Sequence, residues 1–196
     1  MRSLPRPSQK DNIMRAALSR FAEQGYDGTR VRHIAERAGV SDAALYRHFP
    51  SVEALAQELF ATWFGEFGTR LADAVAEGDT DDKLRAVVRT VLRFYREEPA
   101  AATFILLRQD SLMPALPAGS AYPLETVEAI IATGQQQGLI RNGQPNLLAA
   151  IFLGCVLRPI HLANFAAAGA FDLLAETGHD TTIESAALAA VRQETP

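Results

Sequence analysis

Apolar residues recur along the chain three and four positions apart, which is the spacing of one face of an α-helix. Ile13, Ala17 and Phe21 form the first such stripe, so we predict a helix over 8–24 that ends at Gly25. Two short helices follow within 29–49. Further helices are expected at 51–77, 82–97, 101–112, 123–138, 145–168 and 182–192. We therefore predict an all-α fold of about nine helices: a three-helix N-terminal head on a larger C-terminal helical bundle.

The stretch from Thr29 to Phe49 has the pattern of two helices joined by a tight turn. In the first helix, one face would bury four residues at helical spacing, namely Val31, Ile34, Ala35 and Ala38. Gly39 follows them, where a helix often ends in a left-handed residue. Thr29 and Ser41 suit the N-caps of the two helices, because a hydroxyl oxygen accepts from free backbone N–H groups.

The second of these helices has two distinct faces. At about 100° per residue, Leu45 and Phe49 point inward, Ala43 and Arg47 point outward, and Ala44 and Tyr46 lie on the flanks. The expected head core is Phe21, Val31, Ile34, Leu45 and Phe49. A compactly supported helix with a narrow tip and phosphate-binding side chains suits the major groove of DNA. An ordinary helical hairpin within a bundle would show the same spacing.

The run TRVRHIAERAGVSDAALYRHFPSVEAL resembles the helix-turn-helix signature of TetR/AcrR-type transcriptional regulators. The matching residues are Thr29, Ile34, Ala35, Ala38, Gly39, Val40, Ser41, Leu45, Tyr46, His48, Phe49, Ser51, Glu53 and Leu55. The close match covers roughly the first quarter of the chain, and beyond it only the length and the helical layout are similar. The chain departs from the family pattern at His33, Ala43 and Val52, where Asp, Gly and Lys are common.

The resemblance implies a DNA-binding helix-turn-helix domain at 1–50 and a ligand-binding and dimerisation domain at 51–196. It implies a ligand-responsive regulator, a repressor in our interpretation, that binds a palindromic operator as a homodimer and is released by a small-molecule effector. Within the first domain, the candidate DNA-binding residues are Thr29, Arg30, Arg32, Ser41, Asp42, Ala43, Tyr46, Arg47 and His48.

In the second domain, the resemblance implies an effector pocket and a dimer interface. The candidate wall residues are Trp63, Phe67, Phe94, Phe104, Arg108, Cys155, His161 and Phe165. Each apolar one among them is also consistent with plain core. The last two helices, 145–168 and 182–192, would pair with a second copy, because the former is apolar almost all round and needs cover. The alternative is that both helices complete a monomeric core.

Charge is unevenly divided along the chain. The net charge is −4, whereas residues 1–50 hold nine Lys and Arg against five Asp and Glu, which gives +4 and leaves −8 for the rest. A basic head on an acidic body is expected when one end meets phosphate. A chance fluctuation of composition is the alternative.

The sequence offers little for catalysis, metal binding or membrane insertion. A single cysteine, Cys155, excludes an internal disulfide, and there is no Gly-rich phosphate loop, metal-ligand spacing or nucleophile elbow. We therefore expect no catalytic residue, metal or cofactor. The longest apolar run, 147–157, is about half of a bilayer span, and no signal peptide is seen, so we expect a cytoplasmic protein. A helical-bundle enzyme or carrier, and a DNA-binding structural factor without an effector, are the rival interpretations.

Overall fold

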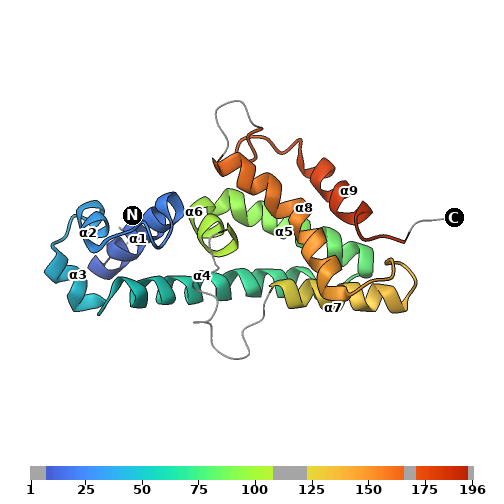
Figure 1. Ribbon diagram of the computed structural model, residues 1–196, viewed down its shortest axis with the longest axis horizontal. Helices are drawn as coiled ribbons and strands as arrows, with labels where there is room; N and C mark the ends of the chain where they lie inside the picture. Colours follow the sequence, from blue (N-terminus) through green and yellow to red (C-terminus); the bar gives the residue numbers. More distant parts are fainter. Residues whose placement is uncertain (1–7, 108–122, 166–170, 194–196) are drawn as a thin grey trace, which may run out of the picture. The chain divides into compact units, whose positions relative to one another are not determined.

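A computed structural model of the protein describes residues 8–107, 123–165 and 171–193 (Figure 1). The predicted all-α fold is confirmed, and the described residues contain nine α-helices and one π-helical turn. In order they are α1 (Gln9–Gln24), α2 (Val31–Ala38), α3 (Asp42–His48), α4 (Val52–Ala74), α5 (Thr80–Glu97), α6 (Pro99–Ala102), η1 (Thr103–Leu107), α7 (Pro123–Gln136), α8 (Pro145–Phe165) and α9 (Asp180–Ala189).

Two helix boundaries differ from the sequence prediction for identifiable reasons. The side chain of Asp79 accepts a hydrogen bond from the backbone N–H of Asp82, so α5 begins at Thr80 and not at residue 82. The helix expected at 101–112 begins earlier, at Pro99, where the missing N–H of proline costs nothing in a first turn. It continues as a π-helical turn to Leu107, and its expected end lies outside the described residues.

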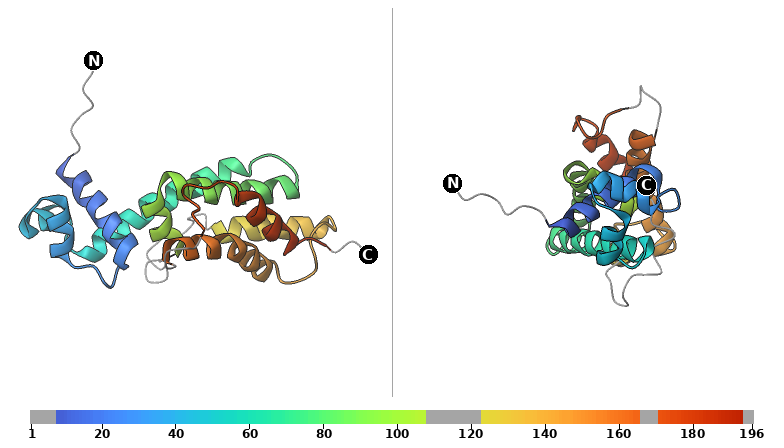
Figure 2. Two further views of the ribbon diagram at one scale, coloured as in Figure 1. Left: turned by 90° about the horizontal axis from the view of Figure 1, so that it is seen from above. Right: turned by 90° about the vertical axis from the view of Figure 1, so that its left-hand side faces the viewer.

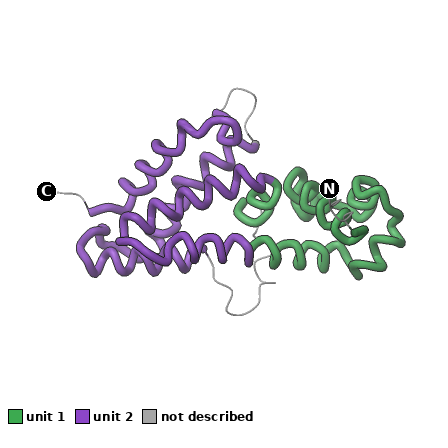
Figure 3. Tube along the Cα trace, turned by 180° about the vertical axis from the view of Figure 1, so that it is seen from behind, with its two compact units in different colours: residues 1–64, 100–117 green, residues 65–99, 118–196 purple. Residues whose placement is uncertain are grey.

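The chain divides into two compact units (Figure 3). Unit 1 comprises residues 1–64 and 100–117, and unit 2 comprises residues 65–99 and 118–196, so α4 contributes to both. The functional boundary expected after residue 50 concerns what each part does, and it stays a prediction.

Unit 1 packs α1, α2 and α3 around a small aromatic core. Phe21 is fully buried, and its ring stacks on Phe104 of η1 at a centroid distance of 5.3 Å. Phe60 of α4 meets the same Phe104 ring edge-on at 5.9 Å. The core of the head is therefore completed by η1, a segment that is distant in sequence.

Unit 2 is a bundle in which α8 packs against α7 and α9, and α5 packs against α7, α8 and α9 (Figure 2). Its core includes Leu84, Val88, Tyr95, Ile131 and Phe152, all at most 2% exposed. These residues lie on one stripe of their own helices, as the helical spacing of apolar positions predicts.

Ion pairs join α5 to the C-terminal part of unit 2. Glu184 of α9 accepts from Arg85 at 2.5 Å and from Arg89 at 2.9 Å. Asp180, at the start of α9, pairs with Arg96 near the end of α5 at 2.5 Å. The position of α9 is thus set by charge as well as by its buried apolar side chains.

Helix α8 is the one helix in the described residues that is long and apolar enough to cross a bilayer by length and composition. The uninterrupted apolar run 147–157 is shorter than a bilayer span, but the stretch 145–164 around it has a mean hydropathy of 1.6 and includes Arg158 as its one charged residue. Only 28% of this apolar part of α8 is buried within the chain.

Candidate nucleic-acid interface and ligand site

The turn between α2 and α3 has the geometry that its sequence predicts. Gly39 adopts a left-handed conformation with φ of 68°, and the next N–H, that of Val40, donates to the carbonyl of Ala35 at 3.0 Å. Ser41 is the N-cap of α3, since its hydroxyl oxygen accepts from the backbone N–H of Ala44 at 3.1 Å. These two features fix where α3 begins.

The predicted cap of α2 is wrong. Arg30, not Thr29, is the N-cap residue, and its backbone N–H donates to Nδ1 of His33 at 3.3 Å. His33 stands where the family pattern commonly has an aspartate, and its ring nitrogen supplies the acceptor that a carboxylate would. Thr29 is only 7% exposed, and its hydroxyl donates to the carbonyl of Gly25 at 2.8 Å. It therefore secures the connection to α1.

Helix α3 buries one face and exposes the other. Leu45 and Phe49 are at most 1% exposed, as predicted, and Ala44 is buried beside them. On α2, Ile34 and Ala35 are buried as predicted, whereas Val31 and Ala38 are half-buried, so the buried stripe of α2 is narrower than expected. The short helix is held by this inner face, which leaves its opposite face open.

The open face of α3 carries six of the nine predicted DNA-binding residues. Tyr46 is 51% exposed, and the other exposed ones are Ser41, Asp42, Ala43, Arg47 and His48. Arg30 and Arg32 at the start of α2 are also exposed. Thr29 alone among the nine is buried.

Ion pairing separates the cations of unit 1 into two groups. Arg37 donates to both carboxylate oxygens of Glu23 at 2.8 and 2.9 Å, and Lys10 pairs with Glu58 at 2.7 Å. Within the described part of the chain, Arg30, Arg32 and Arg47 have no carboxylate within ion-pair distance. Arg15 of α1 also lacks an ion pair in the described part and donates to the amide oxygen of Asn12 instead. The uncompensated cations near α3 are therefore Arg30, Arg32 and Arg47 of the hairpin.

Residues of α1 brace the end of α3. Nε2 of His48 lies 3.0 Å from Oε1 of Gln9, and the ammonium group of Lys10 lies 5.3 Å from the ring centroid of Phe49. Neither Gln9 nor Lys10 is among the candidate DNA-binding residues that the sequence suggests. Nothing in the helical pattern of α1 indicates this bracing, which depends on the angle between the two helices.

The predicted ligand-binding residues are divided between the two units. Phe67 of α4 and Phe94 of α5 are buried in unit 2, with ring centroids 5.0 Å apart. Phe104 and the half-buried Trp63 belong to unit 1. Phe104 packs against Phe21 and so belongs to the core of the head.

The other four candidates lie further along the chain. Cys155 and His161 are half-buried on α8. Phe165 is the last residue of that helix, and its side chain is outside the described part. Arg108 lies outside the described residues altogether. The structure thus brings Phe67 and Phe94 together, and the effector site as a whole stays a prediction.

Comparison with known proteins gives one family match. Residues 13–59 match the family model described as bacterial regulatory proteins, tetR family. The chain is 30% identical over 105 residues to the HTH-type transcriptional repressor KstR2 of Rhodococcus jostii, which is 53% of this chain and 50% of that protein. It thus spans about half the length of this relative.

Similarity extends beyond the head in two further cases. The chain is 29% identical over 136 residues to the fatty acid metabolism regulator protein of Bacillus subtilis, covering 67% of this chain and 70% of that one. The crystal structure of AibR in complex with isovaleryl coenzyme A and operator DNA superposes with a TM-score of 0.70 at 22% identity, covering 93% of this chain and 97% of AibR. The latter likeness establishes a common fold.

Proposed function

We propose that the chain is a ligand-responsive transcriptional repressor of the TetR type, because residues 13–59 match the tetR family model. Residues 1–50 would bind a palindromic operator, and residues 51–196 would bind the effector and form a homodimer. A protein that acts on the bacterial genome works in the cytoplasm. The observation that supports this proposal most directly is the open face of α3, with Tyr46 at 51% exposure above a fully buried Leu45.

Two sets of contacts with DNA follow from the faces of α2 and α3. Ser41, Asp42 and Ala43 lie at the N-terminal tip of α3, which is the end that approaches base edges in helix-turn-helix proteins. Tyr46 and Arg47 lie one turn further along, where a hydroxyl and a guanidinium suit phosphate oxygens. The tip would set the sequence preference, and the phosphate contacts would set affinity and register.

The outer face of α8 supports a homodimer. Leu147, Ile151 and Leu162 are 56%, 37% and 37% exposed, and their spacing places them on one side of the helix. Exposed positions on α9, which packs against α8, are small or polar and would allow close approach of a second helix. A two-fold axis through this face would bring each α8 against its copy and present two heads to the two halves of a palindrome.

We propose acyl-coenzyme A thioesters as the first effector class to test. A relative named as a fatty acid metabolism regulator and a structural neighbour bound to isovaleryl coenzyme A support this choice. In this chain, the adjacent buried rings of Phe67 and Phe94 offer apolar surface for an acyl chain. The ligand would lower DNA affinity only if it bound the DNA-free dimer more tightly than the DNA-bound dimer.

Fluorescence anisotropy with duplex DNA from the protein's own promoter region tests the DNA-binding part. We expect binding at low ionic strength, and a weaker affinity for Tyr46→Phe across different DNA sequences, because a phosphate contact carries no sequence information. Tyr26→Phe is the matched control, since Tyr26 packs near Phe21 in the same unit. If no promoter fragment binds, with or without candidate ligands, the proposed function is wrong.

Thermal unfolding tests the effector part separately. A ligand that binds the folded state raises the melting temperature by an amount set by its concentration relative to its Kd. We expect isovaleryl- or longer acyl-coenzyme A to raise the melting temperature and to release labelled operator DNA. Free coenzyme A is the control, because it lacks the acyl chain. Equal affinity of an acyl thioester for free and DNA-bound dimer would contradict regulation by release.

A further inference from the structure

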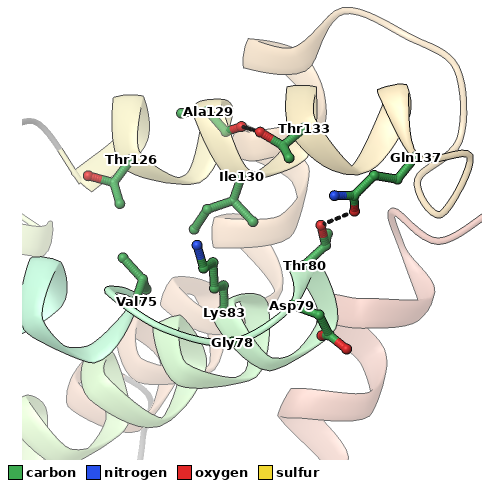
Figure 4. A pocket seen from close by; sticks show the side chains of 10 residues that line it. All are labelled: Val75, Gly78, Asp79, Thr80, Lys83, Thr126, Ala129, Ile130, Thr133 and Gln137. Carbon is green, nitrogen blue, oxygen red and sulfur yellow. Dashed lines mark hydrogen bonds between the residues drawn. The ribbon is translucent and has the colours of Figure 1, made fainter.

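A separate cavity lies in unit 2, between the start of α5 and one face of α7 (Figure 4). Its volume is about 310 Å³, at the lower end of the range for small-molecule sites. The six predicted effector-binding residues whose side chains are described do not line it. Its wall combines apolar side chains, including Val75 and Ile130, with polar ones that are unusual between packed helices.

Lys83 supplies a positive charge to this cavity. Its ammonium group extends from α5 towards Ile130 of α7 (Figure 4). Three other cations of α5 are ion-paired, namely Arg85, Arg89 and Arg96. By contrast, no carboxylate oxygen in the described part of the chain lies within ion-pair distance of Lys83. A cation in a partly desolvated hollow without a counter-charge favours an anionic ligand.

Gln137 supplies a hydrogen-bond donor to the same cavity. The hydroxyl of Thr80, which is 5% exposed, donates to Oε1 of Gln137 at 2.8 Å. This bond fixes the carboxamide so that its NH2 group faces the hollow (Figure 4). The ammonium of Lys83 on α5 and the amide of Gln137, in the turn directly after α7, thus offer two donor groups from two different segments.

Asp79, the acidic residue at the rim of the cavity, does not neutralise the charge of Lys83. Asp79 lines the cavity, but its carboxylate caps α5 by accepting from the backbone N–H of Asp82 at 2.9 Å, and it points away from Lys83 (Figure 4). The hydroxyl of Thr133 already donates to the carbonyl of Ala129 at 2.9 Å. The groups that remain free to bind a ligand anion are therefore Lys83 and Gln137.

We propose that this cavity binds a small organic carboxylate. The carboxylate would pair with Lys83 and accept from the NH2 group of Gln137, while a short apolar body would lie against Val75, Ala129 and Ile130. A coenzyme A thioester is far too large for this volume, so the site is additional to the proposed effector site. Its occupancy does not depend on DNA binding or on the proposed function.

The sequence makes a direct test possible, because it contains only two lysines, Lys10 and Lys83. Reductive methylation with carbon-13 keeps both charges and yields one side-chain NMR signal for each lysine. Benzoate is the probe, at constant ionic strength, and benzamide is its uncharged counterpart. We expect benzoate to shift the Lys83 signal saturably, with a Kd in the millimolar range or tighter, and benzamide to leave it unchanged. Lys10, which is paired with Glu58, is the internal control.

Calorimetry on the unmodified protein tests the residue assignments. Lys83→Met keeps most of the aliphatic stem and should weaken benzoate binding at least tenfold, since a charge-assisted contact is lost. Gln137→Leu should weaken it by a smaller factor, and Arg93→Met, which removes an exposed cation from the same helix, should leave it unchanged. Circular dichroism establishes that each variant is folded. A Lys83 signal that moves only linearly with benzoate, or folded Lys83→Met with undiminished affinity, would overturn the proposal.

Discussion

The unpaired cations of the head predict a specific salt dependence of operator binding. Each phosphate contact releases counterions, so log K falls with log salt concentration by about 0.9 per contact. If Arg30, Arg32 and Arg47 each meet one phosphate, a dimer makes six contacts and the slope is about −5. Replacing Arg47 by Gln in both protomers removes two contacts, so the slope should become shallower by about 2.

The size of this effect is readily measured. Between about 50 and 200 mM KCl, a slope of about −5 corresponds to a roughly thousandfold loss of DNA affinity. Over the same range, the DNA affinity of the Arg47→Gln variant should fall only about a hundredfold. Anisotropy titrations at several salt concentrations give both slopes. Arg47 lies in the last turn of α3, where a cation also favours the helix dipole. Melting curves must therefore show that the variant head remains folded.

Arg37→Gln is the matched control for this prediction. Arg37 lies on α2 with a side chain 39% exposed, but its guanidinium is held by both carboxylate oxygens of Glu23. Its removal should leave the slope nearly unchanged, because the charge it loses was already compensated. The reasoning is refuted if Arg47→Gln keeps the wild-type slope, or if Arg37→Gln changes the slope as much.

Three further predictions concern stability. Leu45→Ala should lower the free energy of unfolding of the head by about 2–5 kcal/mol, because the side chain is fully buried, and chemical denaturation followed by circular dichroism measures this. Burial raises the pKa of Glu184, but hydrogen bonds from two α5 arginines outweigh it and leave the pKa below its ordinary value. The ionised group therefore stabilises the fold above the unfolded-state pKa, near 4.5, and this contribution is lost as the pH falls through the lowered folded pKa. Glu184→Gln should cost about 1–2 kcal/mol near pH 7 and little near pH 3, as urea titrations at both pH values would show; an equal cost at both would contradict it. Gly134→Ala should destabilise unit 2 by about 1–3 kcal/mol, because a new Cβ would lie 2.5 Å from Cγ1 of Ile140. Gly65→Ala should stabilise the protein by up to about 1 kcal/mol, because a new Cβ there would have nothing within 4 Å. Melting temperatures of the two variants that shift in the same direction would contradict this pair of predictions.

The head was predictable from sequence because its local signals agree. Gly39 requires a left-handed turn, Ser41 caps the next helix, and Leu45 with Phe49 defines a single buried face. Each of these features depends on neighbours within a few residues, which is the range over which a sequence pattern constrains geometry. The exposed face of α3 follows directly once the buried face is known.

Contacts between residues that are distant in the sequence could not be predicted in the same way. The hydroxyl of Thr29 could cap α2 or reach back to α1, and only the packing angle between the helices decides in favour of Gly25. Phe104 is a sequence candidate for either a ligand pocket or plain core, and the helical pattern does not indicate its contact with Phe21, which is 83 positions away in the sequence. The sequence pattern does not indicate the cavity beside Lys83 either, because its wall combines residues of α5, α7 and the segments next to their ends, with no common motif.

The effect of the charge asymmetry depends on which charged residues form ion pairs, and not only on how many there are. In the described part of unit 2, the arginines that face α9 are each bound to a carboxylate, so they offer little attraction to phosphate. In the described part of unit 1, Lys10, Arg20 and Arg37 are similarly compensated, while Arg15 of α1 and the hairpin cations Arg30, Arg32 and Arg47 are not. A polyanion would therefore experience attraction at the hairpin and repulsion from an acidic body, which disfavours nonspecific contact elsewhere on the protein. Composition predicts that one end is basic, but only the ion pairs indicate which cations of that end are uncompensated, and three of these, Arg30, Arg32 and Arg47, lie on the hairpin.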